Sequence, residues 1–179
     1  MMNTNEKFFD SDEHNTIYFK SNYPSQWYLS SFTIYDNNEQ KSITYNCCEQ
    51  RMMHKKALLF GDNETAELII KATEPSEQKK LGRLVKNFDV NKWNEVADQI
   101  VEDANYSKFS QNPDLKQLLI NSGTKKFVEC APYDPIWGIG LNITDALNTP
   151  ESEWKGTNRL GKAIMRARER ILYDKFLNN

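Results

Sequence analysis

Glu49 and Lys56 are the two residues whose types and spacing are best suited to chemistry. They lie seven residues apart in a segment with a helical pattern, and seven residues make nearly two turns, so both side chains project from one helix face. An acid and an amine placed there could act as proton donor and nucleophile. The spacing also has a structural explanation, because Asn46-x-x-Glu49 matches a capping box and most lysines are solvated. Spacing alone favours that structural explanation.

A second candidate is the segment Asp134-Pro135-Ile136-Trp137-Gly138-Ile139-Gly140. Its carboxylate, indole and glycines could hold a ribose diol, stack a base and let backbone amides approach a phosphate. Its glycine pattern is too short for a dinucleotide-binding fingerprint. A surface turn in which Trp137 fills the core explains the composition equally well, but the long loop expected over residues 131–150 favours a functional role.

Other residues carry weaker signals. Arg83 could pair with a phosphate or with a surface carboxylate, and Trp93 lies on an apolar helical stripe, where core packing is its expected role. His14 falls near the N-terminus and His54 lies off the helix face described above, so neither is expected to be a catalytic base. Serine and cysteine nucleophile motifs such as GxSxG do not occur in the sequence.

Local patterns predict the elements that would position these residues. Residues 1–15 are polar and are expected to form a flexible leader, and residues 16–179 a single domain. Helices are expected after Asn46, Asp62, Pro75, Asp89, Asn112 and Asn158. Short strands are expected over residues 16–20, 32–35, 42–45 and 126–130, with a hairpin turn at Asp36-Asn37-Asn38. The predicted fold class is α+β, a helix-dominated single domain with a small sheet.

Composition narrows the class of protein. The chain has 179 residues, 39% of them hydrophobic, and a net charge of −2. It has no apolar run long enough to span a membrane, and its acidic N-terminus does not resemble a secretory signal. Three poorly spaced cysteines favour a reducing, cytoplasmic location, and neither a metal site nor a cofactor is expected. A pI of about 5.8 argues against binding of duplex nucleic acid through a broad basic surface.

Several ordered segments together resemble the NADAR family, also called YbiA-like. The resemblance runs from about Tyr18 to Leu172 and rests on Ser25-Gln26-Trp27, the stretch from Tyr45 to Ala57, Phe60-Gly61-Asp62, Leu81-Gly82-Arg83, Phe88 to Trp93, Lys108 to Asn112, Val128-Glu129, Asp134 to Gly140, and Asn158 to Gly161. Some members have Ser-Asn-Phe in place of Ser25-Gln26-Trp27, which puts this chain in a Gln-Trp branch.

The resemblance implies a YbiA-like fold and a hydrolase that breaks N-glycosidic bonds in nucleotide-like compounds. It implies two substrate classes, guanine carrying ADP-ribose and the ribosylamino-pyrimidine intermediates of riboflavin synthesis. The first is preferred here, on a nucleoside or on DNA. By the same resemblance the catalytic residues are Glu49, Lys56 and Asp134, and the substrate-binding residues are Gln26, Trp27, Arg83, Trp93, Trp137, Gly138 and Asn158.

Two chemical routes and one non-catalytic role fit these residues. Glu49 and Asp134 could serve as the paired carboxylates of a glycosidase. The resemblance favours the other route, in which a neutral Lys56 amine attacks C1′ and a Schiff base forms. This route requires the pKa of Lys56 to fall. A reader that binds ADP-ribose without turnover is the third possibility. Partners are then an ADP-ribose-containing or ribosylamino nucleotide, with ADP-ribosylated DNA as a further candidate and no membrane.

Overall fold

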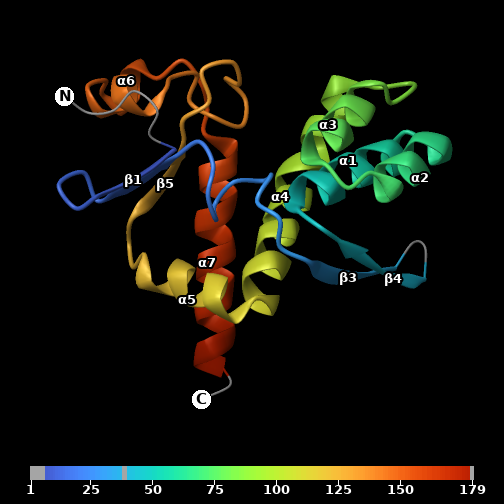
Figure 1. The fold of residues 1–179 in the computed structure, drawn as a ribbon, viewed down its shortest axis with the longest axis horizontal. Coiled ribbons are helices and arrows are strands. Elements are labelled where there is room, and N and C mark those ends of the chain that lie inside the picture. The colour runs from blue at the N-terminus through green and yellow to red at the C-terminus, as the bar shows by residue number, and fades with distance from the viewer. Residues whose placement is uncertain (1–6, 38–39, 178–179) are drawn as a thin grey trace. The chain divides into compact units, whose positions relative to one another are not determined.

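The computed structural model describes residues 7–37 and 40–177, which fall into two compact units. The first unit combines the chain up to Tyr28 with the chain from Gln117 onward, and the second unit is Leu29–Lys116. Helices dominate both units, and small sheets accompany them, so the fold class is α+β as predicted (Figure 1). Within the described ranges, no helix is both long and apolar enough to cross a membrane.

The first unit is built on a three-stranded sheet with strand order β1-β2-β5. β1 (Phe8–Ser11) pairs antiparallel with β2 (Thr16–Phe19), and β2 pairs parallel with β5 (Lys126–Glu129). All four residues of β2 are buried, as expected of a central strand covered on both faces. β1 lies inside the segment predicted to be a flexible leader. That prediction is therefore wrong for residues 8–11, while residues 1–6 lie outside the described part.

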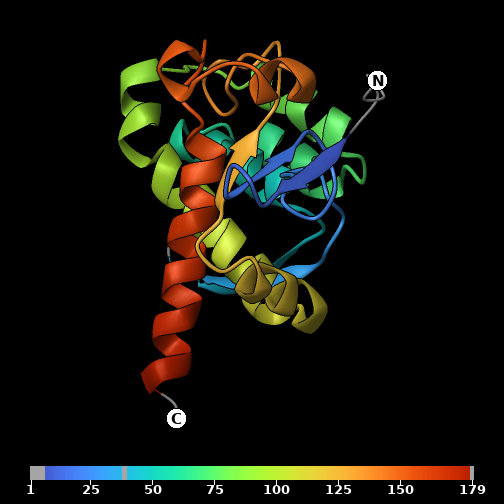
Figure 2. The same cartoon turned by 90° about the vertical axis from the view of Figure 1, so that its left-hand side faces the viewer.

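Different segments cover the two faces of this sheet. α7 (Arg159–Leu177) runs along β5 in both views (Figure 1 and Figure 2). A side chain at Gly161 would overlap the carbonyl of Phe127, so this glycine allows α7 to approach the strand. The other face packs against residues that follow β5, including Ile139, Leu141 and α6 (Ile143–Leu147). α6 interrupts the loop expected over residues 131–150, and η1 (Glu151–Glu153) follows it.

The second unit joins a hairpin to four helices. β3 (Phe32–Asp36) and β4 (Lys41–Tyr45) pair antiparallel and form a separate two-stranded sheet, so the chain has two small sheets where one was predicted. The helices are α1 (Cys48–Leu59), α2 (Asn63–Lys71), α3 (Pro75–Arg83) and α4 (Val90–Gln111), and the boundary between the units falls within α5 (Pro113–Asn121).

The second unit centres on α1, which packs against α2, α3 and α4. The predicted starts at Asp62, Pro75 and Asp89 are confirmed: the Asp62 and Asp89 carboxylates accept helix-start N–H bonds, and Pro75 is the first residue of α3. The predicted cap of α1 is wrong, because Cys47 and not Asn46 occupies that position, without a side-chain cap.

Candidate functional site

Two buried glutamines fix the start of α1. The side-chain amide of Gln50 donates to the carbonyls of Ile69, Ile70 and Ala72, each at 3.1 Å, and its oxygen accepts the N–H of Asn46 at 2.8 Å. Gln78 of α3 donates to Ala72 O at 2.9 Å and to Asn46 Oδ1 at 3.0 Å. The bond that returns to the Asn46 amide therefore comes from Gln50, not from Glu49 as a capping box predicted.

Glu49 and Lys56 both project from α1, as their spacing predicted. Glu49 is only 5% exposed, and Lys56, two turns later, is half-buried. The Lys56 Nζ donates to the carbonyl of Gly82 on α3 at 2.8 Å. A Cβ atom at position 82 would overlap the side chain of Met53 on α1, so the glycine lets α3 come close enough for this bond.

The surroundings of Lys56 shift its protonation. The Nζ lies 4.2 Å from the centroid of the Phe88 ring, which takes the place of water on that side. Burial lowers the pKa of Lys56 from its ordinary value, the nearby guanidinium of Arg83 lowers it further, and Glu49 acts in the opposite direction. The net direction is downward, so a larger fraction of the amine is neutral and nucleophilic than in a solvated lysine.

Glu49 and Arg83 thus both act on Lys56 through their charges, and a fourth predicted residue of the second unit has a different environment. Arg83 is the exposed last residue of α3 and influences Lys56 through its charge. Trp93 is 7% exposed and lies on the buried stripe of α4 with Ala97 and Val101. This position agrees with the packing role that its spacing predicted.

The neighbouring thiols are not reactive groups. Cys47 and Cys48 are fully buried, and burial raises their pKa values to about 12 and about 11. Both stay protonated at neutral pH, and the thiol is a poor nucleophile. Neither thiol therefore competes as a nucleophile with the Lys56 amine, which lies in the last turn of the same helix.

In the first unit, Asp134 shapes the loop that carries Trp137. Its Oδ1 accepts the backbone N–H groups of Ile136 at 3.1 Å and of Trp137 at 2.9 Å. The half-buried Trp137 ring has the Arg159 guanidinium 4.7 Å from its centroid. The structure therefore brings Asp134 and Trp137 together, and it gives the carboxylate a local role in turning the chain.

Gly138 and Asn158 tie this loop to the sheet. The Asn158 side chain donates to Phe127 O at 2.8 Å and accepts the Glu129 N–H at 3.1 Å, and its own N–H donates to Gly138 O at 3.0 Å. A Cβ atom at position 138 would come within 2.9 Å of Glu129 O. Both residues have structural functions here, and their assignment to substrate binding remains a prediction.

The remaining pair of predicted binding residues lies just after β2. Gln26 is 6% exposed, whereas Trp27 is 44% exposed and donates its backbone N–H to Ser25 Oγ at 3.2 Å. An indole left open to this extent could contact a ligand. Their role in substrate binding also remains a prediction.

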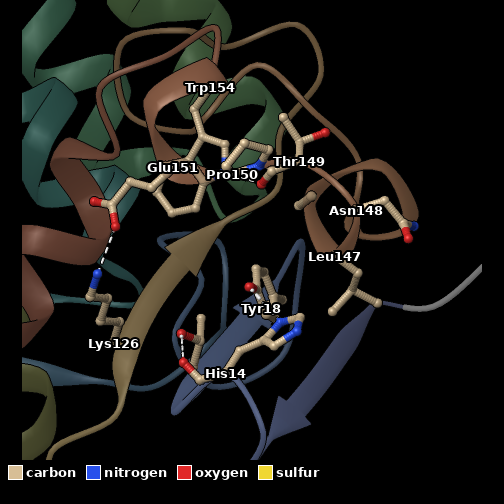
Figure 3. A pocket seen from close by; sticks show the side chains of 11 residues that line it. His14, Tyr18, Lys126, Leu147, Asn148, Thr149, Pro150, Glu151 and Trp154 are labelled. Atoms are coloured by element: carbon tan, nitrogen blue, oxygen red, sulfur yellow. Dashed lines mark hydrogen bonds and ion pairs between the residues drawn. The ribbon is translucent and has the colours of Figure 1, made fainter.

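The first unit also contains a hollow of about 390 Å³ that none of the predicted residues lines (Figure 3). His14 and Tyr18 form one wall, with His14 Nδ1 and the Tyr18 hydroxyl 3.1 Å apart, and Lys126 pairs with Glu151 at 2.6 Å beside it. The polar atoms drawn there bond mainly to one another. In the described ranges, no three His, Cys, Asp or Glu side chains gather as metal ligands would.

Sequence reasoning gave no role to Gly82 and Phe88, which make the direct contacts to Lys56. Both lie in segments that carried the family resemblance, Leu81-Gly82-Arg83 and Phe88 to Trp93. Nothing in their spacing could place them against position 56, because the contacts depend on how α3 and the segment after it pack on α1. The signal that could have found Gly82 is the close helix approach that a glycine in the last turn of a helix permits, and no local signal points to Phe88.

Comparison with known proteins places this geometry in context. Residues 8–172 match the NADAR domain. The chain is 45% identical over 145 residues to N-glycosidase R617 of Acanthamoeba polyphaga mimivirus, covering 81% of this chain and 85% of the relative. It is 35% identical over 158 residues to Protein irg-1 of Caenorhabditis elegans, covering 86% of this chain and 74% of the relative.

A solved structure supports the same relationship at the level of the fold. The NMR structure of the Escherichia coli protein YbiA matches with a TM-score of 0.68 and 22% sequence identity, covering 98% of this chain and 96% of that chain. The match to the NADAR domain starts at residue 8, where β1 begins, so it includes the N-terminal strand.

Proposed function

The chain belongs to the NADAR family, and we propose that it is an N-glycosidase that hydrolyses the C1′–N bond of a nucleotide-like substrate. The relative from mimivirus and the protein from Nostoc punctiforme, 29% identical over 156 residues, are both named N-glycosidases. The observation that carries the proposal is the Lys56 amine, which is half-buried beside Glu49 and has a lowered pKa.

In the proposed reaction the Lys56 amine is the nucleophile. Lys56 first passes its proton to the Glu49 carboxylate. The amine electron pair then forms a bond to C1′ as the C1′–N bond to the base breaks, and the leaving nitrogen takes the proton from the Glu49 carboxylic acid. The ribose ring then opens, and the C1′–Nζ bond becomes a protonated Schiff base. Water adds to C1′ of the Schiff base, and breakdown of this adduct releases the sugar and leaves Lys56 protonated and Glu49 ionised, as at the start. The sum is one water consumed and one N-glycosidic bond broken.

Asp134 has a smaller part in this proposal than the sequence suggested. A two-carboxylate mechanism needs a second acid at the anomeric carbon. The Oδ1 of Asp134 accepts two backbone N–H bonds that hold the Trp137 loop. We therefore assign the covalent step to Lys56 and treat catalysis by Asp134 as the alternative that the trapping experiment tests.

For the substrate, we propose guanine that carries ADP-ribose. The family resemblance of the Glu49, Lys56, Asp134 and Trp137 segments supports this class, as does the acidic pI of about 5.8, which suits one modified nucleotide better than a long duplex. No cofactor or metal is needed for the proposed steps, and a cytoplasmic location remains our prediction.

Borohydride trapping tests the covalent step. The protein is incubated with ADP-ribosylated guanosine and sodium cyanoborohydride, and intact mass is measured. We expect an adduct of one ADP-ribose in the wild type and in Lys92→Ala, whose Nζ also lies over an aromatic ring, 5.7 Å from that of Phe60. We expect none in Lys56→Ala. Release of free ADP-ribose by the wild type without an adduct would favour the two-carboxylate route.

The same assay separates the substrate classes. Release of ADP-ribose from modified guanosine or from ADP-ribosylated DNA supports the proposal. Cleavage of a ribosylamino-pyrimidine phosphate alone would assign the protein to riboflavin intermediates. Binding of ADP-ribose in calorimetry, with no cleavage of any of these compounds, would show a non-catalytic reader and overturn the enzyme proposal.

A further inference from the structure

Hydrogen bonds on both sides of Phe88 fix the segment between α3 and α4, which carries its aromatic ring. The backbone N–H of Lys86 donates to Asp62 Oδ2 at 2.9 Å, which fixes the segment to the start of α2. Asn87 has a φ of 57°, a left-handed conformation that turns the chain. The Asp89 carboxylate then accepts the N–H groups of Asn91 and Lys92 at 2.8 and 2.9 Å. Phe88 lies between these fixed points.

The Phe88 ring contacts a cation on its face and a second ring at its edge. The Lys56 Nζ lies 4.2 Å from its centroid, and the Phe60 ring packs against it at 5.4 Å with an interplanar angle of 67°. Phe88 is nevertheless 45% exposed. A phenylalanine that remains this exposed contributes little to a core, so its contact with Lys56 is the feature that needs explanation.

We propose that Phe88 is a positioning residue for the Lys56 amine: its ring and the Gly82 carbonyl hold the protonated amine in place until the proton leaves. This inference rests on the proposed role of Lys56. Both contacts depend on charge, because a cation is attracted to a ring face and an ammonium is a stronger hydrogen-bond donor than an amine. Loss of the proton weakens both contacts together, which frees the nucleophile when it becomes reactive.

The charged groups around this amine come from α1, α3, α4 and the segment between α3 and α4. Glu49 on α1 favours its protonated form, and Arg83 on α3 favours its neutral form. In the segment after α3, the ammonium of Lys86 bonds to Glu64 at 3.0 Å, and the Asp89 carboxylate caps α4. Lys92 of α4 donates to Leu59 O at 3.4 Å. The Phe88 ring also attracts the ammonium but is uncharged, so its attraction can be altered without changing any of these charged groups.

Replacing Phe88 by pentafluorophenylalanine in the full chain tests the inference. Fluorination keeps the ring close to its shape and removes the negative face that attracts a cation. The protein is pulsed with deuterated acetic anhydride across a pH series, and acetylation of Lys56 is read by peptide mass spectrometry. We expect the midpoint of Lys56 reactivity to fall by about half a pH unit, and to rise in Phe88→Trp, whose larger ring attracts cations more strongly.

The matched control is the same replacement at Phe176, which is 78% exposed on α7. We expect no shift of the Lys56 midpoint there. An unmoved midpoint in the fluorinated Phe88 protein, or equal shifts at both positions, would overturn the inference. Because acetylation needs no substrate, its result is separate from the proposed function: a shifted midpoint in a protein that forms no borohydride adduct would sustain the positioning role and refute the Schiff-base step.

Discussion

The surroundings of Lys56 and the loop from Asp134 to Asn158 contain similar side chains and use them differently. Each has an acid, a cation and an aromatic ring. In the second unit the Lys56 amine makes contacts that substrate or deprotonation can replace, one to a carbonyl and one to a ring face. In the first unit Asp134 and Asn158 make short bonds to backbone groups of their own loop and of β5.

The difference shows that the same type of side chain can be a reacting group in one place and a structural group in another. A group that reacts needs a perturbed protonation state and contacts that can be given up. A group that shapes a loop needs partners that stay paired, since an unpaired buried backbone group is costly. The comparison therefore predicts opposite outcomes: substitutions of the reacting groups Glu49 and Lys56 should reduce activity more than stability, and substitutions of Asp134 and Asn158 in the loop should reduce stability first.

The largest effect is expected for Lys56→Met. Removal of the nucleophile should lower kcat for release of ADP-ribose by roughly a thousandfold or more. The free energy of unfolding should stay unchanged or rise, because Met keeps the apolar stem and removes a charge whose burial is unfavourable. Chemical denaturation and steady-state kinetics measure the two quantities on one preparation. A variant that unfolds readily while keeping activity would reverse the comparison.

The second largest effect is expected for Glu49→Gln. If Glu49 protonates the leaving nitrogen, kcat should fall by about a hundredfold or more, since general acid catalysis contributes roughly 10²–10⁴. A substrate analogue with a better leaving group should recover much of the loss, because its departure needs no proton. An equal loss for both substrates would argue that Glu49 supports the fold at the start of α1 and does not donate a proton.

Asn158→Gly should show the opposite behaviour. Glycine tolerates the left-handed backbone of this residue, which has a φ of 51°. It removes the side chain that pairs with Phe127 O and the Glu129 N–H. Two backbone groups then lose their partners, and the free energy of unfolding should fall by about 2–5 kcal/mol. Urea denaturation measures the loss.

The exposed Asn148, whose side chain bonds to Thr144 O at 2.8 Å, provides the control for that experiment. Asn148→Gly should cost much less, because water replaces the lost bond. If Asn158→Gly proved as stable as the control while substrate KM rose sharply, Asn158 would be a binding residue, as the family resemblance implied.

Much of this could be predicted from local sequence. The helix starts at Asp62, Pro75 and Asp89 depend on residues beside them and were predicted correctly. β1 was missed because its pairing with β2 decides its structure, and because the polar residues on both sides of Phe8 and Phe9 leave only a short apolar run. The cap of α1 was assigned one residue early, because the long-range bonds of Gln50 decide where that helix begins.

The candidate site likewise has parts that local sequence could predict and parts that it could not. Periodicity placed Glu49 and Lys56 on one helix face, which the structure confirms for their position on α1. It could not identify Gly82 or Phe88 as contacts of Lys56, since both come from other elements. Likewise, a motif that contains Asp134 does not show whether the carboxylate faces a ligand or its own backbone, which only the folded loop decides.

A smaller effect on the Lys56 side of the comparison is expected for Gly82→Ala. The new methyl group would overlap the Met53 side chain, and relief of that overlap should cost about 1–3 kcal/mol of stability. Combining it with Met53→Ala gives a double-mutant cycle that measures the overlap as a non-additive term. Additive losses would show that the glycine is needed for a reason other than contact with Met53.

The smallest expected effect tests charge alone. Arg83 lowers the pKa of Lys56, so Arg83→Met should raise it, by some tenths of a pH unit at this exposed position. The neutral amine is the form that acetylates, and its fraction rises with pH through the pKa, so the reactivity midpoint should move to higher pH. Arg83→Lys keeps the charge and should leave the midpoint near the wild-type value.

Glu49→Gln removes an attraction to the ammonium and should move the midpoint to lower pH. If Arg83→Met and Glu49→Gln shifted it in the same direction, altered packing would explain both, and the Lys56 region would resemble the structural loop more than an active site.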